Sequence, residues 1–220
     1  MGSVTTINQR FYDAPLPPIT LEHVDLTSLT AKSVADLIAT MPGTRLGVAA
    51  SYGGKCVLDA LAFSTESRVL LITMSHNSRL TKRQLGILRE GLLCNTLVEK
   101  HGFFMERLVA ALHLDFGLYI CNAFDITSDA DTRGSMAAYK DVLGEARPEH
   151  VLDESVVEFI FAQQSFILSR KAEFALRAWA CYVVVEGAPD EPGVIDTSTK
   201  GSQARSYYWH VRLLPDHSDR

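Results

Sequence analysis

The chain has none of the long apolar runs that membrane proteins carry. No stretch of its 220 residues approaches the roughly 18 to 20 uninterrupted apolar residues of a membrane-spanning helix. The N-terminus also lacks the basic-then-apolar pattern of a secretory signal peptide. We therefore expect a globular intracellular protein, nuclear or cytoplasmic, with enough apolar residues, 47%, to bury a substantial core.

Cysteine is scarce, and the spacing of the cysteines does not indicate a metal site. The four cysteines have neither the close pairing of a zinc site nor the density of a secreted disulfide scaffold. Each lies in or beside an apolar run, where a free thiol behaves as a small hydrophobe. We expect buried free thiols at Cys56, Cys94, Cys121 and Cys181.

The chain also lacks an excess of positive charge. A formal net charge of −5 argues against a protein whose whole surface binds nucleic acid. Two local basic clusters remain, one with Arg79, Lys82, Arg83 and Arg89, the other with Arg170, Lys171 and Arg177. Because positive charge supplies most sequence-independent affinity for nucleic acid, five of these residues are candidate phosphate contacts. They are Arg79, Lys82, Arg83, Arg170 and Lys171, and an ordinary solvated surface is the alternative interpretation.

The first third of the chain predicts an extended segment, a helix and three strands. Residues 1–28 hold three prolines and few periodic apolar positions, which indicates an extended lead-in. A short amphipathic helix over 30–41 is stopped by Pro42-Gly43. Strands are predicted at 45–51, 55–64 and 67–74, the last two as an antiparallel hairpin.

Helices and strands then alternate, which favours an α/β domain with a mixed sheet. The pattern predicts helices at 81–93, 104–117, 134–144 and 153–182, and strands at 95–102, 118–126, 181–187 and 206–214. The last helix is apolar nearly all round, as expected of one buried on several sides. The two late strands are separated by a polar loop, 187–205, that we expect to be mobile.

Several segments in this order resemble one nuclease family. The most specific is "HGFFMERLVAALHLDFGLYICNAFDI", residues 101–126, with its His-Gly opening, "DFGLY" and Asn-x-Phe-Asp. "KCVLDALAFSTESRVLLITM", "SMAAYKDVLGE" and "LDESVVEFIFAQQSFIL" match further segments. Together they resemble the RNase D-like (DEDDy-type) three-prime to five-prime exonuclease domain, in its exosome-associated and Werner-exonuclease branch. The resemblance implies an RNase H-like, DnaQ-like fold with a mixed central sheet flanked by helices.

On this basis we divide the chain into three parts. Residues 1–28 are the extended lead-in, and 29–182 are the exonuclease-like domain. Residues 183–220 add late strands and the mobile loop, a C-terminal β extension packed on the same domain.

The family's catalytic residues are missing where the resemblance places them. Such nucleases use two divalent ions, held by four carboxylates, and a tyrosine that orients the attacking water. The first-strand Asp-x-Glu becomes Ala49 and Ser51, and the Tyr-x-x-x-Asp of the last motif becomes Phe159 and Gln163. The second-motif aspartate aligns with Leu108 counting back from "DFGLY", or with Glu106 counting forward from the histidine. We therefore predict no catalytic residues, no bound metal and no cofactor.

These losses predict a pseudo-exonuclease. The resemblance implies a scaffold or adaptor in an RNA-processing or RNA-silencing complex, with protein partners ranked above RNA and a homodimer considered. The alternative is a metal-dependent exoribonuclease with a rearranged site that uses Glu106, Asp125 and Asp129. For Asp125 itself, we favour a structural carboxylate at a strand end or helix cap.

Overall fold

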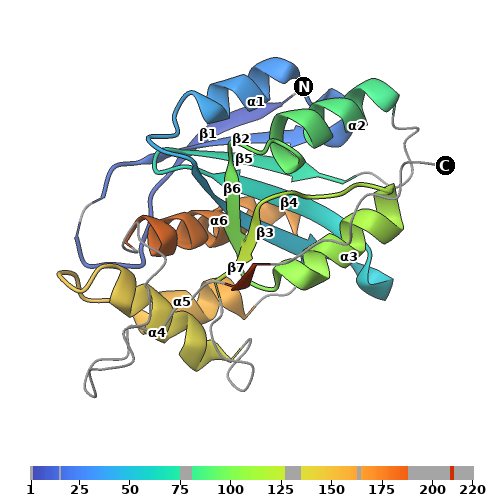
Figure 1. The fold of residues 1–220 in the computed structure, drawn as a ribbon. Helices are drawn as coiled ribbons and strands as arrows, with labels where there is room; N and C mark the ends of the chain where they lie inside the picture. The colour runs from blue at the N-terminus through green and yellow to red at the C-terminus, as the bar shows by residue number, and fades with distance from the viewer. Residues whose placement is uncertain are drawn as a thin grey trace, which may run out of the picture.

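A single mixed sheet organises the computed structural model, which describes residues 2–14, 16–74, 81–126, 135–162 and 165–187 and the backbone of 209–210 (Figure 1). The strands are β1 Ser3–Ile7, β2 Ile19–Asp25, β3 Arg45–Tyr52, β4 Leu58–Ser64, β5 Arg68–Thr73, β6 Glu99–Gly102, β7 Ala123–Asp125 and β8 Trp209–His210. Their order across the sheet is β1-β2-β5-β4-β3-β6-β7-β8. β2 and β5, β3 and β6, and β6 and β7 pair in parallel, and the other neighbours are antiparallel. The predicted mixed sheet and the β4–β5 hairpin are thus confirmed.

Within the described ranges, six α-helices cover the two faces of the sheet (Figure 1). They are α1 Ala31–Ile38, α2 Lys82–Leu88, α3 Met105–Phe116, α4 Met136–Ala146, α5 Glu154–Phe161 and α6 Lys171–Glu186. Short turns flank them: η1 Leu26–Ser28, η2 Gly54–Cys56 and η4 Leu168–Arg170 are 3-10 helices, and η3 Arg89–Leu93 is a π-helical turn. None of the described helices is long and apolar enough to cross a membrane.

Two hydrophobic cores result, one on each face of the sheet. Side chains of α1, α2 and α3 form one core, and those of α4, α5 and α6 form the other. The strands contribute side chains to both cores, because successive side chains of a strand point to opposite faces of the sheet. On β4, Leu61 and Phe63 enter the first core, while Ala60 and Ala62 enter the second.

The predicted long helix over 153–182 and the following strand are wrong. α5 ends at Phe161, and α6 begins only at Lys171. α6 then continues through "CYVVVE", which the sequence assigned to a strand. The β-branched run is helical because Val183 and Val185 are buried between the sheet and its covering helices, and such packing overrides local propensity.

Three smaller expectations also change. The lead-in is extended, yet it supplies β1 and β2, and Ile19 and Leu21 of β2 are fully buried. α4 runs past the expected terminal glycine, Gly144, to Ala146. All four cysteines are free as predicted, and Cys181 is buried, whereas Cys56 is exposed and the other two are half-buried.

Candidate functional site

The end of β3 is the candidate site, because the family resemblance places its metal-binding pair there. Ala49 packs into the core on the α6 side, whereas Leu46 and Val48 pack into the core on the other side. By the same alternation, Gly47 and Ser51 share the face of Ala49. The residues that align with Asp-x-Glu therefore do face α6.

α6 lies directly on this face of the strand. A Cβ atom on Gly47 would lie 2.1 Å from the carbonyl oxygen of Ala178 and 2.4 Å from the backbone nitrogen of Tyr182. Arg45 also donates a 2.8 Å hydrogen bond from Nη1 to the carbonyl oxygen of Val185. Only glycine permits such close contact between a strand and a helix backbone.

The floor beside Ala49 and Ser51 consists of small side chains. In the antiparallel register of β3 and β4, Ala49 pairs with Ala62 and Ser51 with Ala60. Ser51, Ala60 and Ala62 are fully buried. Of these four side chains, only the neutral hydroxyl of Ser51 could act as an oxygen ligand.

Aromatic side chains from three segments pack in the same core as Ala49. Tyr139 of α4 stacks on Phe161 of α5 with ring centroids 4.3 Å apart. Phe103 meets both rings edge-on, at 4.7 Å from Tyr139 and 5.7 Å from Phe161. Burial raises the pKa of Tyr139 to about 12, so its hydroxyl stays protonated. The contacts within this cluster hold α4 and α5 together on the face of the sheet that α6 also covers.

Asp125 has a structural role at the beginning of α3. This last residue of β7 is 1% exposed, and the backbone N–H of Met105 donates to its Oδ2 at 2.9 Å. The capping position itself is occupied by Phe104, whose φ of 58° is left-handed and whose side chain makes no capping bond. Asp125 satisfies an otherwise unpaired helical N–H, which agrees with the interpretation as a helix-cap carboxylate.

The His-Gly pair that opens the motif is also built into the fold. Gly102 lies where a Cβ atom would be 2.6 Å from the carbonyl oxygen of Val48 on the neighbouring strand. The ring of His101 stacks on Phe124 at 4.9 Å, and its Nε2 lies 3.1 Å from Glu99 Oε2. Burial lowers the pKa of His101 to about 4, so the ring is neutral at pH 7.

The two alignments of the second motif lead to different environments. Leu108 is 1% exposed and belongs to the core on the α1, α2 and α3 face, away from the face of Ala49. Glu106 is exposed on the first turn of α3. In the described ranges no group of three or more histidine, cysteine, aspartate or glutamate side chains is placed to hold a metal ion. Asp129, the third residue of the alternative metal site, lies outside those ranges.

Phe159 does not belong to the core into which Ala49 packs. Its side chain is 57% exposed on α5, and the guanidinium of Arg170 lies 4.2 Å from the centre of its ring. It lines a groove of about 710 Å³ together with the N-terminal segment and α6. Gln163, aligned with the last aspartate, lies outside the described residues.

The helix next to β3 is α6. The sequence analysis did not predict that side chains of α6 would lie at the candidate site. Cys181 is completely buried close to the backbone of Val48 and Phe103, and burial raises its pKa to about 12. Arg177 donates from Nε to the carbonyl oxygen of Ile160 at 2.8 Å, and burial lowers its pKa to about 10. The available signal was Arg177, the one charged residue within the apolar run 174–185.

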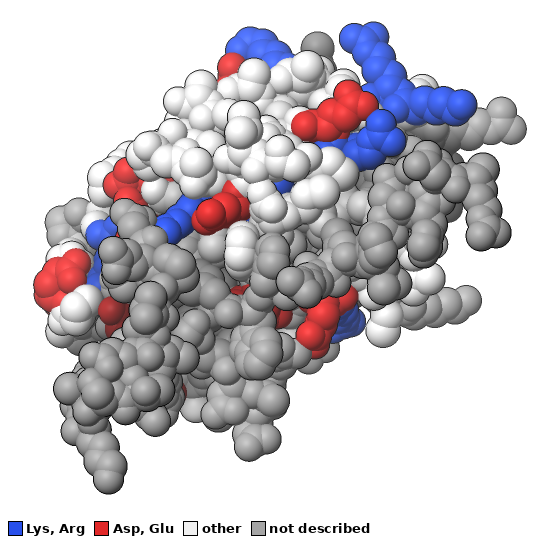
Figure 2. Space-filling view, in the orientation of Figure 1, with Lys and Arg blue, Asp and Glu red and all other residues white. Residues whose placement is uncertain are grey.

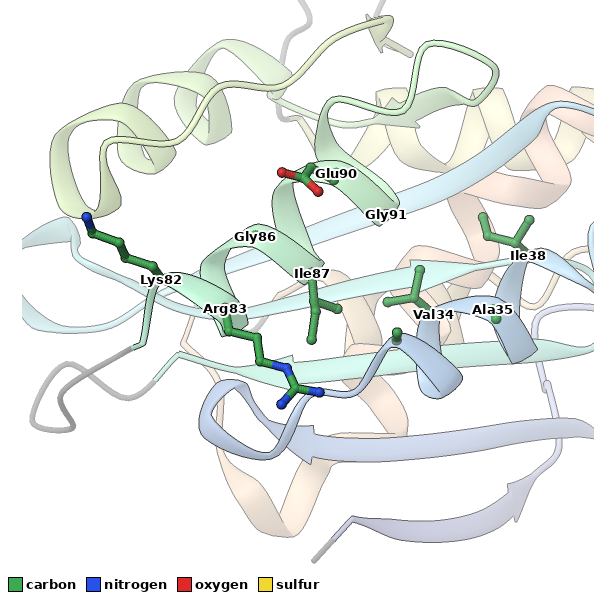
Figure 3. Close-up of a pocket in the computed structure, with 10 residues that line it drawn as sticks. Val34, Ala35, Ile38, Lys82, Arg83, Gly86, Ile87, Glu90 and Gly91 are labelled. Carbon is green, nitrogen blue, oxygen red and sulfur yellow. The ribbon is translucent and has the colours of Figure 1, made fainter.

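The two basic clusters have different surroundings. Lys82 and Arg83 are exposed at the beginning of α2 and line a groove of about 590 Å³ between α1 and α2 (Figure 3). Figure 2 shows basic side chains over α2 with acidic ones immediately beside them. In the second cluster, Arg170 covers Phe159 and Lys171 Nζ donates to Ser3 Oγ at 3.2 Å. Arg79 lies outside the described residues.

Comparison with known proteins identifies the fold. No family model and no curated protein matches the chain. Trypanosoma brucei RNase D in complex with GMP is similar with a TM-score of 0.51 and 11% identity, covering 79% of this chain and 58% of that one. A nuclease in its apo form gives a TM-score of 0.50 and 14% identity, covering 75% and 77%. The exonuclease domain of Aedes aegypti Nibbler gives 0.48 and 15%, covering 75% and 86%. At these identities the likeness shows the fold alone, and the predicted RNase H-like exonuclease fold is confirmed.

Proposed function

We propose that this chain is an exonuclease-like domain that has no nuclease activity and serves as a scaffold in an RNA-processing or RNA-silencing complex. One observation carries the proposal. On the face of β3 where the resemblance places the metal-binding pair, the chain has Ala49 and Ser51 beside the alanines of β4. A domain that keeps the fold of a nuclease and lacks this pair is suited to binding.

The side chains present do not fit a two-metal centre. Mg²⁺ takes oxygen ligands and is bound in such sites through carboxylates. An alanine offers no ligand, and a buried serine offers one neutral oxygen. The carboxylate of Asp125 accepts the N–H of Met105 and holds the beginning of α3. We therefore assign no catalytic step to this face.

The charge distribution supports protein partners ahead of RNA. The net charge is −5, and the basic side chains over α2 lie beside acidic ones (Figure 2). An RNA-binding surface is normally a patch or stripe of one sign. The connection to RNA rests on the fold shared with RNase D.

A nuclease assay tests the loss of activity. The purified chain is incubated with end-labelled single-stranded RNA and DNA in Mg²⁺ or Mn²⁺, and its thermal unfolding is followed with and without each metal. We expect no shortening of either substrate and no change in Tm. Metal-dependent trimming would contradict the proposal if Glu106→Ala or Asp125→Asn abolished it. Glu145→Ala, an exposed glutamate on α4, is the matched control.

A separate experiment tests the scaffold. The tagged chain is used to capture partners from extracts with and without ribonuclease, and each captured protein is then tested as a purified pair. We expect a direct complex, resistant to ribonuclease, with a protein that binds or processes RNA. Capture that ribonuclease abolishes would favour RNA as the partner and contradict the ranking. Light scattering of the purified chain determines whether it forms a homodimer.

A further inference from the structure

Two cysteines that are 27 positions apart in the sequence lie side by side. Cys94 follows the π-helical turn η3, and its N–H donates to the carbonyl oxygen of Arg89 at 2.7 Å. Cys121 precedes β7, and its N–H donates to the carbonyl oxygen of Leu93, the residue before Cys94, at 2.8 Å. That bond joins the two backbone segments at the cysteines themselves.

The thiol of Cys94 also points toward the segment that holds Cys121. Cys94 Sγ donates to the carbonyl oxygen of Tyr119 at 3.3 Å, and the thiols of Cys94 and Cys121 are hydrogen-bonding neighbours. A disulfide requires Cα atoms roughly 4.4 to 6.8 Å apart and side chains that converge. The backbone hydrogen bond between the two segments and the neighbouring thiols favour such a bond between Cys94 and Cys121. Both cysteines are free and partly accessible to solvent.

A buried lysine joins the same two segments. Lys100 of β6 is fully buried, and its Nζ donates to the carbonyl oxygens of Asn95 at 2.6 Å and Cys121 at 3.0 Å. Burial lowers the pKa of Lys100 to about 8, an effect that the two thiols oppose. Burial and the neighbouring Cys121 raise the pKa of Cys94, whereas the positive charges of Arg89 and Lys100 oppose that rise and favour the thiolate, which is the reactive form of cysteine.

We propose that Cys94 and Cys121 form a redox-active dithiol that closes to a disulfide with hydrogen peroxide, and that Lys100 positions and activates it. One thiol loses its proton, the thiolate attacks a peroxide oxygen, and the O–O bond breaks; the leaving hydroxide takes up that proton, so that a sulfenic acid and one water form. The second thiol attacks the sulfenic sulfur, the S–O bond breaks, and water leaves. Two thiols are oxidised and one peroxide is reduced to two waters. A dithiol reductant reverses the reaction, and the proposal does not depend on the scaffold function.

The other two cysteines serve as internal controls. Cys181 is 1% exposed, so its thiol is shielded from peroxide in the solvent, unlike the half-buried Cys94 and Cys121. Cys56 is exposed and stands apart in the turn η2. Intracellular disulfides are usually transient or redox-sensing, and a partly exposed thiol pair fits that use.

Peptide mapping tests the pair directly. The full chain is treated with hydrogen peroxide, remaining thiols are alkylated, and the digest is examined by mass spectrometry without reduction. We expect a peptide linking Cys94 to Cys121, lighter by two hydrogen atoms than the separate peptides and lost on reduction with dithiothreitol. Cys94→Ser and Cys121→Ser each abolish it, whereas Cys56→Ser retains it. Separately alkylated Cys94 and Cys121, under conditions that oxidise Cys56, would overturn the proposal.

The role of Lys100 has its own readouts. Lys100→Met should slow disulfide formation about threefold or more, and Lys100→Arg should restore part of the rate, because the charge favours the thiolate. Circular dichroism shows whether each variant is folded. In the unaltered chain the rate should rise with pH through the range in which the thiolate forms, because burial and Cys121 raise the pKa of Cys94. A folded Lys100→Met variant with an unchanged rate would refute this role.

Discussion

The two faces of β3 are packed in different ways. On the α6 face, Gly47 lets the helix backbone touch the strand, and Ala49 continues a floor of small side chains. On the opposite face, the larger side chains of Leu46 and Val48 lie between the strand and the helices α1, α2 and α3. Alternate residues of one strand thus build a close contact on one side and an interdigitated core on the other. The close face is also the one where the resemblance would place the metal ligands.

The largest expected effect comes from Gly47→Val on the close face. The new side chain would begin 2.1 Å from the carbonyl oxygen of Ala178, so α6 must move or the strand must distort. We expect a loss of more than about 4 kcal/mol in the free energy of unfolding, measured with urea, or failure to fold. A loss below about 1 kcal/mol would show that α6 does not lie on the strand.

A pair of phenylalanines on α5 tests the aromatic cluster. Phe161→Ala removes a ring that packs on Tyr139 and Phe103 and should cost roughly 3 kcal/mol in urea unfolding. Phe159→Ala removes an exposed ring whose contact is the Arg170 guanidinium, and it should cost about 1 kcal/mol or less. Equal losses would contradict the assignment of Phe161 to the inner face of the helix.

His101 gives the close face a pH dependence. Its pKa is lowered from 6.5 to about 4, so the unfolded chain binds an additional proton between these values. The stabilisation is complete above pH 6.5 and is lost as the pH falls toward 4, by roughly 3 kcal/mol at most. We expect His101→Asn to flatten this part of the stability curve, measured by chemical unfolding from pH 7 to 4. His113→Gln, at an exposed position on α3, should leave the curve unchanged.

The smallest expected effect is a gain at Gly86 of α2. Apart from its chain neighbours and the backbone of its own helix, no atom lies within 4 Å of a Cβ built there. Alanine favours the helix by about 0.8 to 1 kcal/mol over glycine, so Gly86→Ala should raise Tm slightly in a calorimetric scan. It is the matched control for Gly47, since both changes enlarge a glycine. A destabilised Gly86→Ala would mean that the groove between α1 and α2 is less open than the structure indicates.

Local patterns predicted most of the regular structure. The alternation of 55–64 indicated β4, and the end of α3 was marked by Gly117, which adopts a φ of 64°. The break between α5 and α6 was missed because Phe166 and Ile167 continue the apolar pattern. Hydrophobicity therefore could not separate Phe159, which is exposed, from Phe161, which packs inward.

The sequence by itself determined which side chains stand at positions 49 and 51, and alternation determined that they share a face of the sheet. Only the tertiary structure decided that this face meets α6, and that Cys94 meets Cys121 beside Lys100. The reason is that periodicity within a segment reports which side of an element is buried. The partner of that side comes from elsewhere in the chain and is selected by close packing, which no local pattern records.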